Sequence, residues 1–234
     1  MKKNMIVALA AMTLWTGANA QNPVKLPTAK QEGGMPLMEA LHKRHSERTF
    51  SNKAISDATL SQVLWAACGI NRKDEKRITA PSAMNKQDIV VYVCRKEGAW
   101  KYNAQQHSLE PVCKEDLRKY VAGRQEAVAE APIMLVLCSD HTKFGEVGSS
   151  QHDIMGALDC GYVSQNIALA CTSLGMNTVP RMTMDQDALR KALNLPSTTQ
   201  LLINHLLDGI VSLSYISKVW RTSILVKCLK CLQM

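Results

Sequence analysis

Apolar residues in this chain alternate between two periodicities, which restricts the fold to mixed architectures. One stretch repeats them at the three- and four-residue spacing of a helix: Leu60, Val63, Leu64, Ala67 and Cys68. Ser56 supplies an N-cap before this stretch, and Gly69 supplies a stop after it. Residues 89–94 and 133–138 are instead short runs of β-forming apolar residues, which predict buried strands. The chain therefore predicts an α+β fold.

A short helix beginning after Pro36 is expected to face a core through Leu37, Met38 and Leu41. Three more stretches carry the same periodicities: helices over residues 115–130 and 184–193, and a last strand over 200–204. There is no internal repeat, and the length of 234 residues suits one domain with a sizeable core.

The N-terminus has the pattern of a secretory signal. Lys2 and Lys3 precede an apolar run over residues 5–15, and Ala18-Asn19-Ala20 places small residues where a signal peptidase reads. We expect cleavage after Ala20 and an exported protein, either periplasmic or secreted. The apolar run is too short for a stable membrane anchor.

The composition argues against nucleic acid and metal ions as partners. The net charge of +8 comes from dispersed Lys and Arg, with no nucleic-acid-binding motif and no aromatic stripe, so no nucleic-acid partner is expected. Four of the eight cysteines lie in apolar helices or strands and are expected as buried thiols: Cys68, Cys94, Cys138 and Cys171. Cys228 and Cys231 have metal or redox spacing but lack a second ligand pair, so no metal site is predicted.

Residues 44–50, Arg-His-Ser-Glu-Arg-Thr-Phe, follow directly after the first apolar helix. The guanidiniums of Arg44 and Arg48 and the hydroxyl of Ser46 are donors that suit a phosphate. A solvated basic helix end is the alternative interpretation, because cations near a helix C-terminus are stabilising.

Two further segments decide between these interpretations. Residues 81–87 read Pro-Ser-Ala-Met-Asn-Lys-Gln, and residues 161–175 form a mostly small and apolar helix that contains Gln165-Asn166 and ends at Leu174-Gly175. In this order, the three segments resemble the nitroreductase-like family of FMN-dependent oxidoreductases. The family patterns are Arg-x-Ser-x-Arg/Lys, Pro-Ser-x-x-Asn-x-Gln, and Gly-x-x-x-Gln-Asn-x-x-Leu-Ala leading to Leu-Gly. The resemblance covers residues 36–203.

The resemblance implies a fold, a cofactor and a set of FMN contacts. The fold would be a central, mostly antiparallel sheet flanked by helices, in a dimer. Arg44, Ser46 and Arg48 would hold the phosphate and ribityl chain of FMN, with His45 contributing mainly its backbone. Residues 176–181, which include Thr178 and Val179, would pass the flavin and direct a backbone N–H toward its N5 edge.

The other two segments would complete the site. Pro81, Ser82, Ala83 and Asn85 would reach the FMN of a partner subunit, which implies a homodimer with shared flavin sites; an ordinary turn is the alternative. Gln165 would contact FMN, lie in the dimer interface or support residues that contact FMN.

The implied activity is hydride transfer between a reduced donor, such as NAD(P)H, and an electron-poor small molecule, such as a nitroaromatic or a quinone. The flavin would carry the chemistry, so no side chain is predicted to be catalytic. A non-catalytic secreted module that binds a ligand or flavin with the same fold is the alternative.

The ends of the domain depart from the family pattern. We expect a signal peptide at 1–20, an N-terminal linker at 21–35, the FMN-binding domain at 36–205 and an atypical tail at 206–234. The family's Gly-x-Pro turn and basic residue do not follow the last strand. The tail could be a genuine extension, a membrane-touching segment or an out-of-frame read, and reading the gene in its other frames distinguishes these.

Overall fold

The computed structural model describes residues 22–125, 128–145 and 150–209, so the expected signal peptide and most of the tail lie outside the described residues. The strands are β1 Val24–Lys25, β2 Ile70–Arg72, β3 Arg77–Ile78, β4 Ile89–Arg95, β5 Gly98–Asn103, β6 Ser108–Cys113, β7 Ile133–Asp140, β8 Asn177–Arg181 and β9 Thr199–Asp208. The α-helices are α1 Leu37–Lys43, α2 Asp57–Cys68, α3 Arg118–Ala122, α4 Ser150–Ser173 and α5 Gln186–Ala192. Two short 3-10 helices are η1 Ala83–Asn85 and η3 His141–Phe144.

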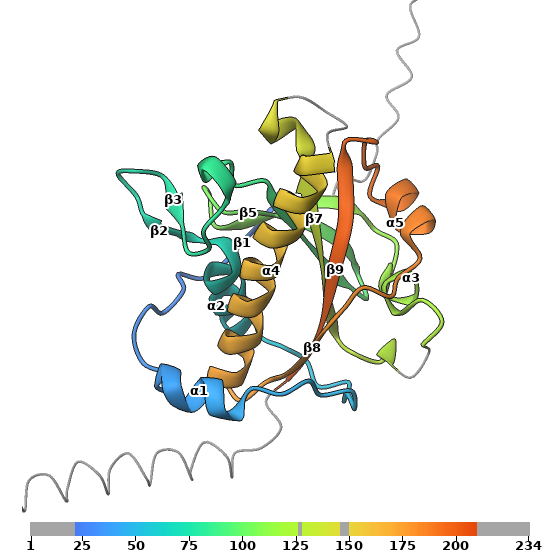
Figure 1. Ribbon diagram of the computed structural model, residues 1–234. Helices are drawn as coiled ribbons and strands as arrows, with labels where there is room; N and C mark the ends of the chain where they lie inside the picture. The colour runs from blue at the N-terminus through green and yellow to red at the C-terminus, as the bar shows by residue number, and fades with distance from the viewer. Residues whose placement is uncertain (1–21, 126–127, 146–149, 210–234) are drawn as a thin grey trace, which may run out of the picture.

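Within these residues, seven strands form one sheet in the order β1, β6, β5, β4, β7, β9, β8 (Figure 1). Every neighbouring pair in it is antiparallel. Strands β2 and β3 form a separate antiparallel hairpin. The predicted α+β fold, with an antiparallel sheet flanked by helices, is confirmed.

The central strands are buried on both faces. In β7, Leu135 and Leu137 belong to a core formed with α2 and α4. The alternate residues Met134 and Val136 belong to a second core formed with α3 and α5. Because successive side chains point to opposite faces, a strand covered on both sides needs an unbroken apolar run. This is why residues 89–94 and 133–138 lack polar alternation.

The longest helix lies across the first of these faces. Helix α4 begins at Ser150, eleven residues before the Gly161 at which the sequence pattern placed it, and packs against α1, α2 and the sheet (Figure 1). Helix α2 agrees with the prediction: the Ser56 side chain accepts a hydrogen bond from the Thr59 N–H, and Gly69 ends the helix.

The orientation predicted for the first helix is wrong. Helix α1 buries Ala40, whereas Leu37, Met38 and Leu41 are 62%, 75% and 45% exposed. A helix of two turns can bury only one side against α4, and here the side that carries the small residue Ala40 is buried. The larger apolar residues are left at the surface.

Two other elements differ in length from the prediction. The helix expected over 115–130 is limited to Arg118–Ala122, because Gly123 has a φ of +62° and ends it. The last strand, expected over 200–204, runs from Thr199 to Asp208 and is mostly buried. The sheet therefore continues past His205, where the sequence pattern placed the end of the domain.

The segment expected as an N-terminal linker is also part of the fold. Strand β1 pairs with β6, and Leu26, Ala29 and Met35 are buried. The β5–β6 hairpin was missed because Lys101 and other polar residues interrupt its apolar pattern. The cysteine prediction is confirmed: Cys68, Cys94, Cys138 and Cys171 are free and buried.

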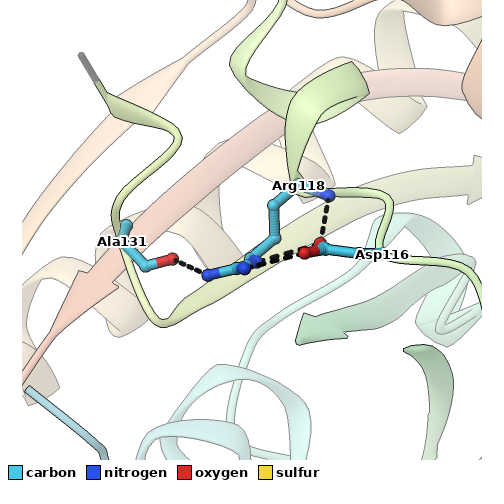
Figure 2. Close-up of polar contacts among 3 residues, drawn as sticks. All are labelled: Asp116, Arg118 and Ala131. Carbon is cyan, nitrogen blue, oxygen red and sulfur yellow. Dashed lines mark hydrogen bonds and ion pairs between the residues drawn. The ribbon is translucent and has the colours of Figure 1, made fainter. Parts of the chain in front are cut away.

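Arg118 braces the connection between α3 and β7 (Figure 2). Its guanidinium donates to both carboxylate oxygens of Asp116, at 2.9 and 2.7 Å, and to the Ala131 carbonyl at 3.2 Å. Burial opposes ionisation of Asp116, but the hydrogen bonds from Arg118 outweigh it and lower the pKa of that carboxyl. One side chain thus ties the segment that leads into α3 to the residues that lead into β7.

Removing the cap of α2 provides a test of the fold. Ser56→Ala deletes the oxygen that accepts the Thr59 N–H, so we expect the free energy of unfolding to fall by about 1 kcal/mol. Ser197→Ala removes the same atom at an exposed position and is expected to change stability by less than about 0.5 kcal/mol. Urea unfolding measures both, and equal effects would contradict the capping assignment.

Candidate functional site

The structure brings the basic segment against the edge of the sheet. The Glu47 N–H donates to the Thr178 carbonyl of β8 at 3.1 Å. Farther along, the N–H and Oγ of Ser51 donate to the two carboxylate oxygens of Asp208 at 2.8 and 2.7 Å. Two groups of predicted site residues, 44–48 and 178–179, therefore meet at the end of strands β8 and β9.

Glu47 stabilises the turn of this segment. Its Oε1 accepts the N–H of Arg48 at 2.7 Å and the N–H of Thr49 at 2.8 Å, and these backbone hydrogen bonds lower the pKa of the Glu47 carboxyl. His45 is exposed, and its Nδ1 lies 2.9 Å from the Lys43 carbonyl. The carboxylate of Glu47 is thus engaged with its own backbone.

The two guanidiniums of the segment are available for a ligand. Arg44 is half-buried and Arg48 is exposed, and neither guanidinium has an ion pair or hydrogen bond with a described residue. Ser46 lies half-buried between them. Two uncompensated cations on an anchored turn fit an anionic group such as the phosphate of FMN.

Thr178 and Val179 contribute backbone to this site, because their side chains point into the protein. Val179 is 1% exposed and belongs to the second core. Thr178 Oγ1 lies 3.1 Å from Nδ1 of His205, whose Nε2 lies 2.7 Å from Ser164 Oγ on α4. Burial lowers the pKa of His205 to about 3, so the ring is neutral.

This network links α4 through β9 and β8 to the basic segment, and it did not emerge from the sequence. Ser164, Thr178 and His205 are far apart in the chain and have no spacing that relates them. A lone polar residue in an apolar strand, such as His205, is the one available signal.

The second predicted group lies elsewhere on the molecule. The Ala83 N–H donates to Oδ2 of Asp159 on α4 at 2.8 Å, and the Gln87 N–H donates to Ser82 Oγ at 2.9 Å. Pro81 and Asn85 are exposed. The contact to Asp159 was also missed, although a carboxylate within an apolar helix is an informative exception.

In a single chain, the two groups lie apart along α4, one beyond its C-terminal end and the other in its first half (Figure 1). Thr178 follows the C-terminal end of α4 at Ser173, whereas Ala83 contacts Asp159, fourteen residues before that end. At 1.5 Å per residue this is about 20 Å along the helix axis. The structure therefore does not unite residues 44–48 with 81–85 within one subunit.

Gln165 lies on the outer side of α4. It is exposed, one turn from Tyr162 and two turns from Leu158, which are 48% and 58% exposed, and Ile154 extends this side at 62%. Residues spaced by three, four or seven positions share one face of a helix. Gln165 thus belongs to an apolar outer face of α4, and α1, which packs on α4, adds the exposed residues Leu37 and Met38.

The described residues hold neither a metal site nor a membrane-spanning helix. Among the residues that the structure describes, no three His, Cys, Asp or Glu side chains form a metal-ligating group. Cys228 and Cys231 lie outside the described residues. No helix in the described ranges is long and apolar enough to cross a membrane.

Comparison with known proteins identifies the class. The model of the nitroreductase family matches residues 41–207. A candidate nitroreductase of Methanocaldococcus jannaschii is 27% identical over 190 residues, covering 77% of this chain and 93% of that protein. Because the family model matches well over half of the sequence, the chain belongs to the nitroreductase family, and it is an oxidoreductase.

Solved structures agree with this family membership. The crystal structure of a candidate nitroreductase from Ralstonia eutropha JMP134 has a TM-score of 0.76 and 30% identity, with 82% of this chain and 91% of that chain covered. The NADPH:FMN oxidoreductase of Vibrio harveyi, solved in complex with NAD+, has a TM-score of 0.57 and 19% identity, with 75% and 69% covered. At this low identity, the second likeness concerns the fold alone.

The buried histidine network can be tested directly. Thr178→Val keeps the shape of the side chain but leaves His205 Nδ1 without its partner, so we expect a loss of about 1–3 kcal/mol of stability. Thr183→Val makes the same change at an exposed position and is expected to cost less than about 0.5 kcal/mol. Urea denaturation compares the two, and an unchanged midpoint for Thr178→Val would contradict the role of the network.

Proposed function

We propose that the protein is an exported, FMN-dependent oxidoreductase that transfers hydride between a reduced donor and an electron-poor small molecule. NAD(P)H is the candidate donor, and a nitroaromatic or a quinone is the candidate acceptor. The observation that carries the proposal is the pair of free guanidiniums, Arg44 and Arg48, on a turn anchored to β8 through Glu47.

The residues present fit FMN. Arg44, Ser46 and Arg48 supply donors for its phosphate, and the Glu47 N–H to Thr178 carbonyl bond holds this turn beside β8. The backbone after Thr178 is the part of the site that would face the isoalloxazine edge. When bound, the flavin supplies the hydride chemistry, and the protein binds and orients it.

We further propose that the active form is a homodimer with shared flavin sites. The apolar outer face of α4 and α1 supports this, since a contiguous exposed apolar surface of this kind marks an interaction site. A twofold axis perpendicular to α4, passing midway between Asp159 and the C-terminal end of the helix, would place α4 antiparallel to its copy. Residues 81–85 of one subunit would then approach residues 44–48 of the other.

Export is supported by Lys2, Lys3, the apolar run over 5–15 and the small residues Ala18 and Ala20. N-terminal sequencing of the protein from its native host tests it. A mature chain beginning at Gln21 is expected. A mature protein that still begins at Met1 would contradict export.

The phosphate contact gives a direct test of the cofactor. Arg44→Ala removes one charge-assisted contact, so we expect FMN affinity to fall by roughly 5- to 150-fold, which corresponds to ~1–3 kcal/mol. Riboflavin lacks the phosphate, so its affinity is expected to stay unchanged. Arg72→Ala, on the β2–β3 hairpin, serves as the control. Fluorescence titration measures the affinities of the native protein and both variants for FMN and riboflavin. Equal affinity of the native protein for the two ligands would refute the phosphate role.

The dimer is tested on the outer face of α4. Leu158→Glu places a charge within the proposed apolar interface, so we expect a shift toward monomer in sedimentation velocity, together with loss of bound flavin. Gln105→Glu adds the same charge at an exposed turn and is expected to leave the dimer intact. A native protein that sediments as a stable monomer with stoichiometric FMN would exclude shared sites.

A further inference from the structure

Two carboxyl groups meet in the core behind the loop of residues 81–87. Asp88, at the end of the loop, is completely buried, and Asp159 on α4 is 3% exposed. Oδ2 of Asp159 accepts the Ala83 N–H at 2.8 Å, and Oδ2 of Asp88 accepts from Ser139 Oγ at 2.5 Å. The two carboxyls also interact with each other, and this interaction raises the pKa of Asp88. The loop is therefore attached to the core through both aspartates.

A hydrogen bond between two carboxyl groups requires a proton on one of them. Oδ1 of Asp88 has no donor or basic partner among the described residues. A proton on this atom, donated to Asp159, removes an otherwise unsatisfied buried oxygen. Oδ2 of Asp88 is already occupied by Ser139. Asp88 Oδ1, buried and without a partner, is therefore the atom to which we assign the proton.

The surroundings contain no cation that could replace this proton. The titratable groups near the pair are Cys160 on α4, Asp140 at the end of β7 and His141 directly after it, and Lys86 lies two positions before Asp88 in the chain. In the described residues, neither Asp88 nor Asp159 forms an ion pair with Lys, Arg or His. The ring of His141 is instead engaged by Gln200 and Asp153.

The loop itself depends on these attachments. Met84, Asn85 and Gln87 have φ values of +50°, +53° and +50°, in the left-handed region that side-chain-bearing residues adopt with strain. Such a conformation persists only where the surrounding contacts impose it. The contacts of Ala83 and Asp88 with α4 and β7 are the ones that reach the core.

We propose that one proton shared by Asp88 and Asp159 holds the 81–87 loop in its docked conformation on α4, which makes Asp88 a positioning residue for the candidate flavin site. The effect on FMN rests on the proposed function. The effect on the loop does not.

The direction of the pH dependence follows from the burial. Burial, and then the neighbouring Asp159, raise the pKa of Asp88 from 3.8 to about 7. When the loop opens, Asp88 reaches water and releases the proton at its ordinary, lower pKa. Docking is therefore strongest below pH 4, weakens as pH rises toward 7, and becomes independent of this group above about pH 8.

Asp88→Asn tests the proposal, because an amide of the same shape can donate permanently to Asp159 and still accept from Ser139. The measurement is hydrogen–deuterium exchange of residues 81–87 in the full-length protein. At each pH, the exchange rate of the native protein is divided by that of the variant. We expect this ratio to rise with pH toward 7, by at most about tenfold per unit for one proton, and then to level off. Asp187→Asn, at an exposed carboxyl on α5, is the control and should match the native protein.

The outcomes are distinct. A ratio that does not change between about pH 5 and pH 8 overturns the proposal. The expected ratio, without any rise in the native FMN Kd over that range relative to the variant, supports the proton and refutes the shared flavin site. If Asp88→Asn does not fold, infrared spectroscopy of the native protein decides instead. A buried protonated carboxyl band present at about pH 6 and lost by about pH 8 supports the proposal, and its absence at pH 6 refutes it.

Discussion

The burial of the sheet on both faces is the constraint on which the rest of the structure depends. Alternate residues of β4 and β7 enter two separate cores, so helices must cover both sides. The side packed by α2 and α4 also sets the length over which the candidate site extends, because α4 packs along β4, β7, β9 and β8 (Figure 1).

This double burial leaves little room for polar side chains, and two of those present are held between polar neighbours. His205 is held between Ser164 and Thr178, and Asp88 between Ser139 and Asp159. Unpaired polar groups in such places would be costly. Each pair also lies directly behind one segment of the candidate site. The core therefore transmits its rigidity to both segments through hydrogen bonds.

The surface, in turn, carries apolar side chains that are not buried within the described residues. Helix α4 is apolar on its inner side, yet it also exposes Ile154, Leu158 and Tyr162, next to Leu37 and Met38 of α1. Scattered surface apolar residues need no explanation, but a continuous face on two packed helices does. The separation of residues 44–48 from residues 81–85 within one chain adds a second reason to expect a partner at this face.

The sequence predicted the α+β class, the cap and stop of α2, the buried cysteines and the order of the three family segments. These depend on local periodicity, capping chemistry and residue type, which are legible without a fold. The exposed face of α1 was not predictable in this way, because the choice between Ala40 and Leu37 as the buried side depends on the space that α4 leaves. The ends of α3 and β9 depended likewise on Gly123 and on pairing with β7.

For the candidate site, the sequence alone determined which groups are available: the guanidiniums of Arg44 and Arg48, the hydroxyl of Ser46 and the polar loop of residues 81–87. Only the tertiary structure decided where they stand. It placed Glu47 against Thr178 and Ala83 against Asp159, and it paired two carboxyls seventy-one positions apart in the chain, Asp88 and Asp159. Residue type fixes the chemistry of a side chain, but distance and burial fix its charge state and partners, and these arise from packing.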